Sequence, residues 1–223
     1  MIDYDNFKIY NYDKIIKKSF APFAESHGFT AKKSLFWYSM YDGFFAAVGF
    51  EKKSIDYETR YFIQPLFISR IEYIVLEYGD TIPQRGAGRD EELMLSRTLE
   101  EEEFINNLEE VKNYTANNIL PQLKRITSIN SLIGALSGKF LACTSLNRIS
   151  LLAYSALYAG KYEDAHYLFK EYLDVEKSFP EPSVVRVSEP ELLLELIERN
   201  PEEARSKLQN NVTKNIEILK LNV

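Results

Sequence analysis

The spacing of apolar residues predicts a helix near the start of the chain. Ile16, Phe20 and Phe23 recur at helical intervals within residues 13–27. Gly28 follows directly and suits the end of such a helix, because glycine adopts the left-handed conformation without a steric penalty. We therefore expect one face of this helix to be buried.

The next stretch predicts a β-hairpin. Residues 34–41 and 43–51 are rich in aromatic side chains and meet at Asp42-Gly43. This dipeptide favours a type I′ turn, whose two central residues both need a positive φ. We expect the alternate apolar residues of the second run to pack in the core and not to stack on nucleic-acid bases.

Two further runs extend the predicted sheet. Residues 60–70 alternate with the two-residue period of a strand, and Pro65 within them indicates a sheet edge or a bulge. Residues 71–79 form the fourth run, and residues 79–90 read as the loop that ends the sheet.

After this loop the periodicity becomes helical. Thr98, with Glu101 three residues later, forms a capping-box pattern that predicts the start of a long helix. We expect this helix to continue to residue 126 with an interruption near Pro121. Its buried face should consist of Phe104, Leu108, Val111, Thr115, Ile119, Leu123 and Ile126.

The last third of the chain reads as helices only. Ser188 and Asn200 each precede a proline and, three residues on, a glutamate, a pattern that predicts two helix starts. Within residues 151–173, the small and aromatic residues are spaced as in one tetratricopeptide-like helical hairpin. Because no second copy follows, we expect no repeat array.

These patterns predict an α+β fold in two parts. In the first, residues 1–137, an antiparallel sheet of about four strands packs against the N-terminal helix and the long helix. The second, residues 138–223, is an all-helical annex. A chain of 223 residues is long enough for one larger domain and a smaller one.

The distribution of charge narrows the class of partner. The net charge is −6, and residues 71–120 alone hold twelve acidic against four basic side chains. Nucleic-acid binders need clustered Lys and Arg to contact phosphates, so we expect no nucleic-acid partner. No stretch approaches the length of apolar residues that a membrane helix needs, and the first residues do not resemble a secretory signal, so we expect a cytoplasmic protein without a membrane partner.

A census of reactive residue types favours a non-enzymatic protein. His27 and His166 are the two histidines and lack flanking metal-ligand patterns, so we expect no metal and no cofactor. Cys143 is the single cysteine and has no base near it in sequence. The Gly-x-Gly of residues 86–88 lacks the further residues of a dinucleotide or phosphate loop.

Two candidate sites remain. The first is an acidic surface for binding a basic protein, formed by Glu91, Glu92, Glu100, Glu101, Glu102 and Glu103. The second is a small-molecule pocket between the aromatic sheet and the long helix, lined by Tyr38, Tyr61, Gln64 and Arg70.

Several short motifs carry a family resemblance. They are Gly28-Phe29 at the end of a helix, the aromatic run Phe36-Trp37-Tyr38, VGFEKK at residues 48–53 and YFIQPLFI at residues 61–68. In order and type they resemble the bacterial family called domain of unknown function 4304, over about residues 13–135. Glu51 and Gln64 depart from the glutamine and asparagine usual in that family. The resemblance implies an α+β fold in a bacterial cytoplasmic protein, without an established reaction.

We therefore expect a protein-binding module. The resemblance adds the narrower hypothesis of an immunity factor that neutralises a bacterial toxin. The alternatives are a small-molecule binding protein or an enzyme of unrecognised type, acting through the aromatic pocket, and a self-associating protein that pairs through its edge strand. The sequence does not specify the oligomeric state.

Overall fold

The protein is described by a computed structural model over residues 10–32, 35–69, 79–81, 95–138, 141, 143–181 and 183–221. The chain divides into two compact units, each built from three chain segments. Unit 1 comprises residues 1–39, 47–61 and 81–121, and unit 2 comprises residues 40–46, 62–80 and 122–223. These units follow contacts in space, whereas the predicted boundary at residue 137 follows the order of elements along the chain.

The strands confirm the predicted α+β class. They are β1 (Thr30–Ala31), β2 (Phe36–Tyr41), β3 (Phe44–Lys52), β4 (Asp56–Pro65), β5 (Gly79–Thr81) and β6 (Leu95–Ser96). Their order in the sheet is β1-β2-β3-β4-β5, with β6 antiparallel to β4. Most of the predicted fourth strand and of the loop after it lies outside the described residues.

The β2–β3 hairpin is confirmed, but its predicted turn type is wrong. Gly43 has a φ of +79°. Lys220 is the one non-glycine residue with a positive φ among those the structure describes, so Asp42 does not adopt the left-handed conformation that a type I′ turn requires. Asp42 instead accepts a hydrogen bond from the Tyr158 hydroxyl at 2.8 Å, a contact that the dipeptide pattern does not encode.

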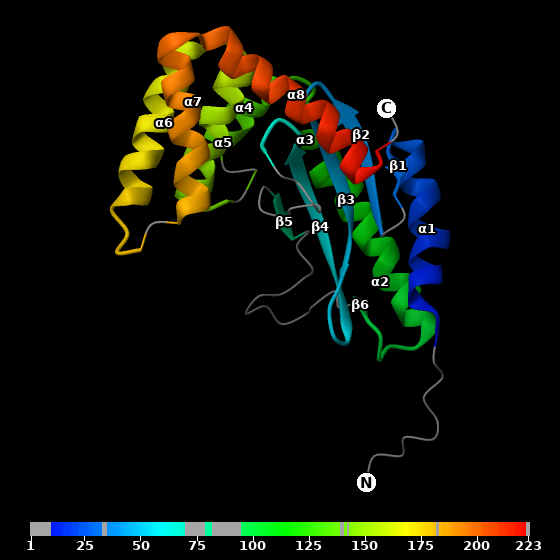
Figure 1. Ribbon diagram of the computed structural model, residues 1–223. Coiled ribbons are helices and arrows are strands. Elements are labelled where there is room, and N and C mark those ends of the chain that lie inside the picture. The colour runs from blue at the N-terminus through cyan, green and yellow to red at the C-terminus, as the bar shows by residue number, and fades with distance from the viewer. Residues whose placement is uncertain are drawn as a thin grey trace. The chain divides into compact units, whose positions relative to one another are not determined.

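The core of unit 1 joins α1 (Tyr12–Ser26) and α2 (Glu101–Tyr114), which lie side by side in Figure 1. The ring centroids of Tyr12 and Phe104 are 4.7 Å apart, and Phe20 lies 4.9 Å from Phe50 of β3. Gly28 ends α1 at a φ of +88°, as predicted. Most aromatic side chains of the hairpin are buried and belong to the core; they are Trp37, Tyr38, Phe44, Phe45 and Phe50.

The long helix has the predicted buried face but not the predicted start. All seven residues of the expected stripe are buried. The helix begins at Glu101 with Glu100 as N-cap, and the Thr98 hydroxyl contacts Ser96 instead, so the predicted capping box is wrong. The π-helical turn over Thr115–Ile119 is wider than an α-helical turn. It therefore keeps stripe residues that are spaced four apart on one face of the helix.

Unit 2 contains the C-terminal helices. They are α4 (Ile129–Ser137), α5 (Ser145–Tyr158), α6 (Tyr162–Lys177), α7 (Val184–Arg199) and α8 (Pro201–Leu219), and the short α3 (Leu120–Leu123) precedes them across the boundary between the units. Consecutive helices from α4 to α8 are neighbours, and α5 also contacts α8. Figure 1 shows α5, α6 and α7 packed together, with α8 leaving the end of α7. The predicted hairpin corresponds to α5 and α6, which Gly160 connects at a φ of +76°.

The two predicted helix starts have different outcomes. Asn200 is the N-cap of α8 and accepts a hydrogen bond from the Glu203 amide, as predicted. Ser188, by contrast, lies inside α7, so that prediction is wrong. The amides of Arg186 and Val187 donate to the Ser183 carbonyl, and the turn before Ser188 is therefore already helical.

Candidate functional site

The acidic start of α2 is an exposed surface. Glu101, Glu102 and Glu103 occupy the first helical turn, where the positive end of the helix dipole stabilises negative charge. They form no ion pair with any residue that the structure describes, whereas Glu100 accepts a hydrogen bond from the Tyr10 hydroxyl at 2.8 Å. This bond is the main reason that the pKa of Tyr10 is raised. Glu91 and Glu92 lie outside the described residues.

The residues predicted to line an aromatic pocket are mostly core residues. Tyr38 of β2 and Tyr61 and Gln64 of β4 are all buried. Tyr61 and Gln64 are three residues apart on one strand, so their side chains point to opposite faces of the sheet. Arg70 lies outside the described residues, so the pocket as a set stays a prediction.

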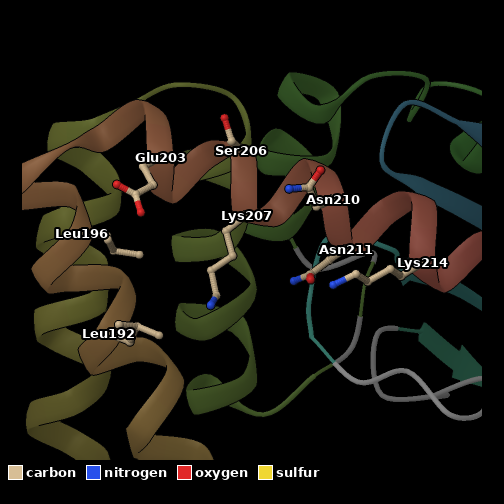
Figure 2. A pocket seen from close by; sticks show the side chains of 8 residues that line it. All are labelled: Leu192, Leu196, Glu203, Ser206, Lys207, Asn210, Asn211 and Lys214. Atoms are coloured by element: carbon tan, nitrogen blue, oxygen red, sulfur yellow. The ribbon is translucent and has the colours of Figure 1, made fainter.

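A cavity that the sequence did not indicate lies between α7 and α8. Its volume is about 470 Å³. Figure 2 shows its lining, which is Leu192 and Leu196 from α7 and Glu203, Ser206, Lys207, Asn210, Asn211 and Lys214 from α8. The α7–α8 cavity thus has an apolar wall on one helix and a polar wall on the other.

Two ammonium groups dominate the polar wall of the α7–α8 cavity. Lys207 and Lys214 are seven residues apart and therefore lie on the same face of α8. Neither forms a hydrogen bond or an ion pair with a residue in the described part of the chain. Asn211 donates its side-chain amide to the Phe67 carbonyl at 3.1 Å. The wall can attract an anionic group, with the α7 leucines beside it to contact an apolar portion.

A second cavity lies at the turn between α6 and α7. Its volume is about 460 Å³, and its lining is Glu176, Phe179, Pro180, Glu181, Ser183 and Arg186. The Glu176 side chain is buried, with the residue only 3% exposed, and its Oε2 has no hydrogen-bond partner among the described residues. A buried carboxylate with an unsatisfied oxygen is uncommon, because desolvation of the charge is not compensated.

The charges near Glu176 are mixed. Tyr172 is buried within electrostatic range of both Glu176 and Arg186. Burial is the main cause that raises the pKa of the Tyr172 hydroxyl, and the Glu176 carboxylate adds to it, whereas Arg186 lowers it. Lys177, the next residue along α6, pairs with Glu191 at 2.6 Å and is thereby held away from Glu176.

Three exposed apolar residues lie close in sequence to the residues that line this second cavity. Val175 and Phe179 are 38% and 49% exposed, and Val184 at the start of α7 is 79% exposed. We call these three residues the α6–α7 surface. They belong to the end of α6, the turn after it and the start of α7; these two helices are yellow and orange in Figure 1. Large apolar side chains gathered near an acidic cavity are typical of a surface that a partner covers.

One signal in the sequence could have revealed Glu176. The buried face of α6 is Ala165, Phe169, Tyr172, Leu173 and Glu176. A glutamate at the next position of an apolar stripe departs from an amphipathic pattern, which places charge on the opposite face.

The histidines and the cysteine occupy ordinary structural environments. His27 Nδ1 lies 2.7 Å from the Phe23 carbonyl at the end of α1, and His166 Nε2 lies 2.9 Å from Glu198. Cys143 is a partly exposed free thiol. Within the described ranges, His, Cys, Asp and Glu residues do not gather in a group of three or more that could hold a metal ion. In the same ranges no helix combines the length and apolar character needed to cross a bilayer.

Comparison with protein-family models, curated proteins and solved structures finds no match to this chain. The resemblance to domain of unknown function 4304 therefore stays a prediction.

Proposed function

We propose that this protein is a non-enzymatic protein-binding module whose partner docks on the α6–α7 surface. The observation that carries the proposal is the exposure of Val175, Phe179 and Val184 at the end of α6, in the turn and at the start of α7. Phe179 also lines the cavity that contains Glu176, whose buried Oε2 has no hydrogen-bond partner among the described residues. Removing such apolar area from water contributes roughly 25 cal/mol per Å², so these side chains favour association when a partner covers them.

The exposed apolar residues of the protein are unevenly distributed, which supports this choice of surface. Seven large apolar residues are exposed in the described part of the chain, and five of them lie on α6, on α7 or in the turn between them. These five are the α6–α7 surface together with Tyr167 and Leu192. A scattered distribution would need no explanation, whereas a concentration on one pair of helices favours a binding role.

The test is affinity capture from lysate of the source cell, at low and at high salt, with captured proteins identified by mass spectrometry. The protein is compared with a double variant, Phe179→Ser with Val184→Ser, and with Ile55→Ser as a matched control. Ile55 is 54% exposed and lies in the β3–β4 connection of unit 1. We expect a specific protein that the wild type and the control capture and the double variant does not.

A partner that all three proteins capture equally would contradict the proposed surface. A fourth protein with Glu100, Glu101, Glu102 and Glu103 changed to Gln tests the acidic start of α2 separately. The acidic surface is the binding site if this variant alone fails to capture the partner at low salt, and if high salt releases the partner from the wild type. The toxin-immunity hypothesis is supported if the captured protein is a toxin that the wild type inhibits and the double variant does not.

A second candidate function is the binding of a small anionic molecule in the α7–α8 cavity. The observation that favours it is the pair Lys207 and Lys214 beside the α7 leucines. Native mass spectrometry of the protein isolated from its source should then show a bound molecule. We expect the molecule to be lost when both lysines are changed to Gln and retained when the exposed Lys161 is changed.

A further inference from the structure

We propose that the cavity at the α6–α7 turn receives the cationic side chain, Arg or Lys, of the partner, with Glu176 as its counter-ion. This inference deepens the proposed function and rests on it, since Phe179 of the α6–α7 surface lines the same cavity. It specifies the chemistry of the partner: a basic residue followed closely by an apolar one.

Glu176 is buried and incompletely hydrogen-bonded. The residue is 3% exposed, and its Oε2 accepts no hydrogen bond from any residue in the described chain. A carboxylate offers about four acceptor sites, and water has little access to the Oε2 of Glu176. Among the described residues, one buried oxygen of the free protein is therefore unsatisfied. Because Glu176 also lines the cavity, a guanidinium or ammonium group seated there can pair with its carboxylate.

Neighbouring cations do not serve this purpose. Lys177 is engaged with Glu191 at 2.6 Å. Arg186 lines the cavity, but it is exposed and does not come within 4.0 Å of the Glu176 carboxylate as an ion pair among the described residues. Arg186 therefore competes with an external cation only through its positive charge at the cavity, and its removal should favour such a cation.

The size and lining of the cavity suit a basic side chain. A volume of about 460 Å³ falls within the range of small-ligand pockets and accommodates a long basic side chain. Phe179 and Pro180 offer apolar contacts to the aliphatic stem of such a side chain, and the Phe179 ring can contact its cation. Glu181 adds a second acid, so Glu176 and Glu181 outweigh Arg186.

Two exposed valines belong to the helix ends that the turn joins. Val175 lies near the end of α6 and Val184 at the start of α7. A partner that inserts a basic side chain would place its next residues against these two valines. An apolar residue beside the basic one would thus bury both itself and the α6–α7 surface.

The experiment uses the full chain, labelled with ¹⁵N, and follows its backbone amides during titration with a defined probe. The probe is N-acetyl-arginyl-leucine amide. Its control is the same molecule with citrulline, which keeps the shape of arginine without the charge. We expect saturable shifts confined to residues around 172–186, and an affinity at least about tenfold lower for the citrulline probe, as expected when one charge-assisted pair is lost.

Variants assign the effect to one carboxylate. Glu176→Gln should reduce the affinity for the arginyl probe about tenfold, to the level of the citrulline probe. Glu181→Gln, in the same cavity, should weaken binding less than Glu176→Gln does, because Glu181 is exposed and solvent screens its charge. Arg186→Ala should tighten binding, because it removes the internal competitor. Circular dichroism establishes that each variant is folded.

Equal binding of the arginyl and citrulline probes to the wild type, or no saturable shift, would overturn the inference whether or not Glu176→Gln folds. The lysate capture separates this failure from that of the proposed function. If Glu176→Gln still captures the partner and the Phe179→Ser, Val184→Ser variant does not, the docking surface stands and the cation site is refuted. If the probe binds through Glu176 but no protein is captured, the cation site stands and the protein-binding function is refuted.

Discussion

Replacing Gly43 with alanine tests the hairpin turn most sharply. Gly43 has a φ of +79°, and an added Cβ would lie 2.9 Å from both Cε1 and Cζ of Tyr158. The Tyr158 hydroxyl donates to Asp42 at 2.8 Å, and its ring stacks on Phe67 with centroids 5.1 Å apart. The substitution therefore strains the backbone and displaces an anchored ring.

The expected cost is the sum of two effects. A left-handed conformation costs a residue with a Cβ about 1–2 kcal/mol. Moving the Tyr158 ring weakens its hydrogen bond to the Asp42 carboxylate, and hydrogen bonds to charged groups contribute about 1.5–3 kcal/mol. We expect Gly43→Ala to lower the free energy of unfolding of the structure that includes this turn by about 3 kcal/mol.

Gly160→Ala is the matched control. Gly160 has nearly the same φ, +76°, but the nearest atom to an added Cβ is Arg205 Cζ at 3.7 Å, an ordinary contact. This variant should lose only the conformational part, about 1 kcal/mol. Tyr158→Phe, which removes the hydroxyl alone, isolates the other part.

Urea unfolding followed by circular dichroism measures all three variants, and the slopes of the transitions show whether the unfolded states are comparable. Equal losses for Gly43→Ala and Gly160→Ala would refute the reasoning, because the Tyr158 contact would then contribute nothing. A Tyr158→Phe variant as stable as the wild type would refute the hydrogen-bond part alone.

Two further predictions concern anchoring contacts within each unit. In unit 2, Asn215 is buried and donates to the carbonyls of Leu66 and Ile68 at 2.7 and 2.8 Å. Asn215→Leu leaves these two acceptors unpaired and should lower the free energy of unfolding by about 3 kcal/mol. Urea unfolding measures this loss, and an unchanged midpoint would contradict it. In unit 1, the Tyr57 hydroxyl donates a hydrogen bond to the Asp13 carboxylate. This bond is the main cause that lowers the pKa of Asp13, and burial is the main cause that raises the pKa of Tyr57. The stability due to the Asp13 carboxylate should be present above its unfolded pKa of about 3.9 and lost as pH falls, and the stability due to the Tyr57 phenol should be lost as pH rises above about 10. Tyr57→Phe should raise the Asp13 pKa in an NMR titration and reduce the alkaline loss, to which other tyrosines with a raised pKa, such as Tyr158, also contribute. An unchanged Asp13 titration would show that the bond does not set this pKa.

Long elements with a clear period were predictable. The stripe of the long helix from Phe104 to Ile126 is buried at every expected position. A helix with a single apolar face removes that face from water by packing it against the core. In the same stripe, three successive intervals between buried residues are four residues long. An ordinary α-helix would place such residues progressively farther from the buried face. Burial of the stripe therefore accompanies the π-helical turn at Thr115–Ile119.

Short polar signals were less reliable, because tertiary contacts compete with them. Asn200 caps α8 as predicted, yet Thr98 contacts Ser96 and does not cap α2. Ser188 matches the same pattern as Asn200 but lies within α7, whose start is at Val184. A cap contributes only about 1 kcal/mol, so packing of the neighbouring residues decides whether it is used.

The candidate sites show the same limit. The acidic start of α2 could be found from sequence because its glutamates are adjacent. The cavity around Glu176 could not be found in this way, since its lining comes from the end of α6, the turn and the start of α7, and its character depends on which oxygen lacks a partner.

By itself the sequence determined the α+β class, the first helix and its Gly28 terminus, the hairpin and the buried stripe, because local period and glycine stereochemistry act over a few residues. The tertiary structure alone decided the conformation of Asp42, the amide contacts of Asn215 and the isolation of Glu176. These features depend on side chains that are far apart in the chain or on the absence of a neighbour, and no local pattern carries that information.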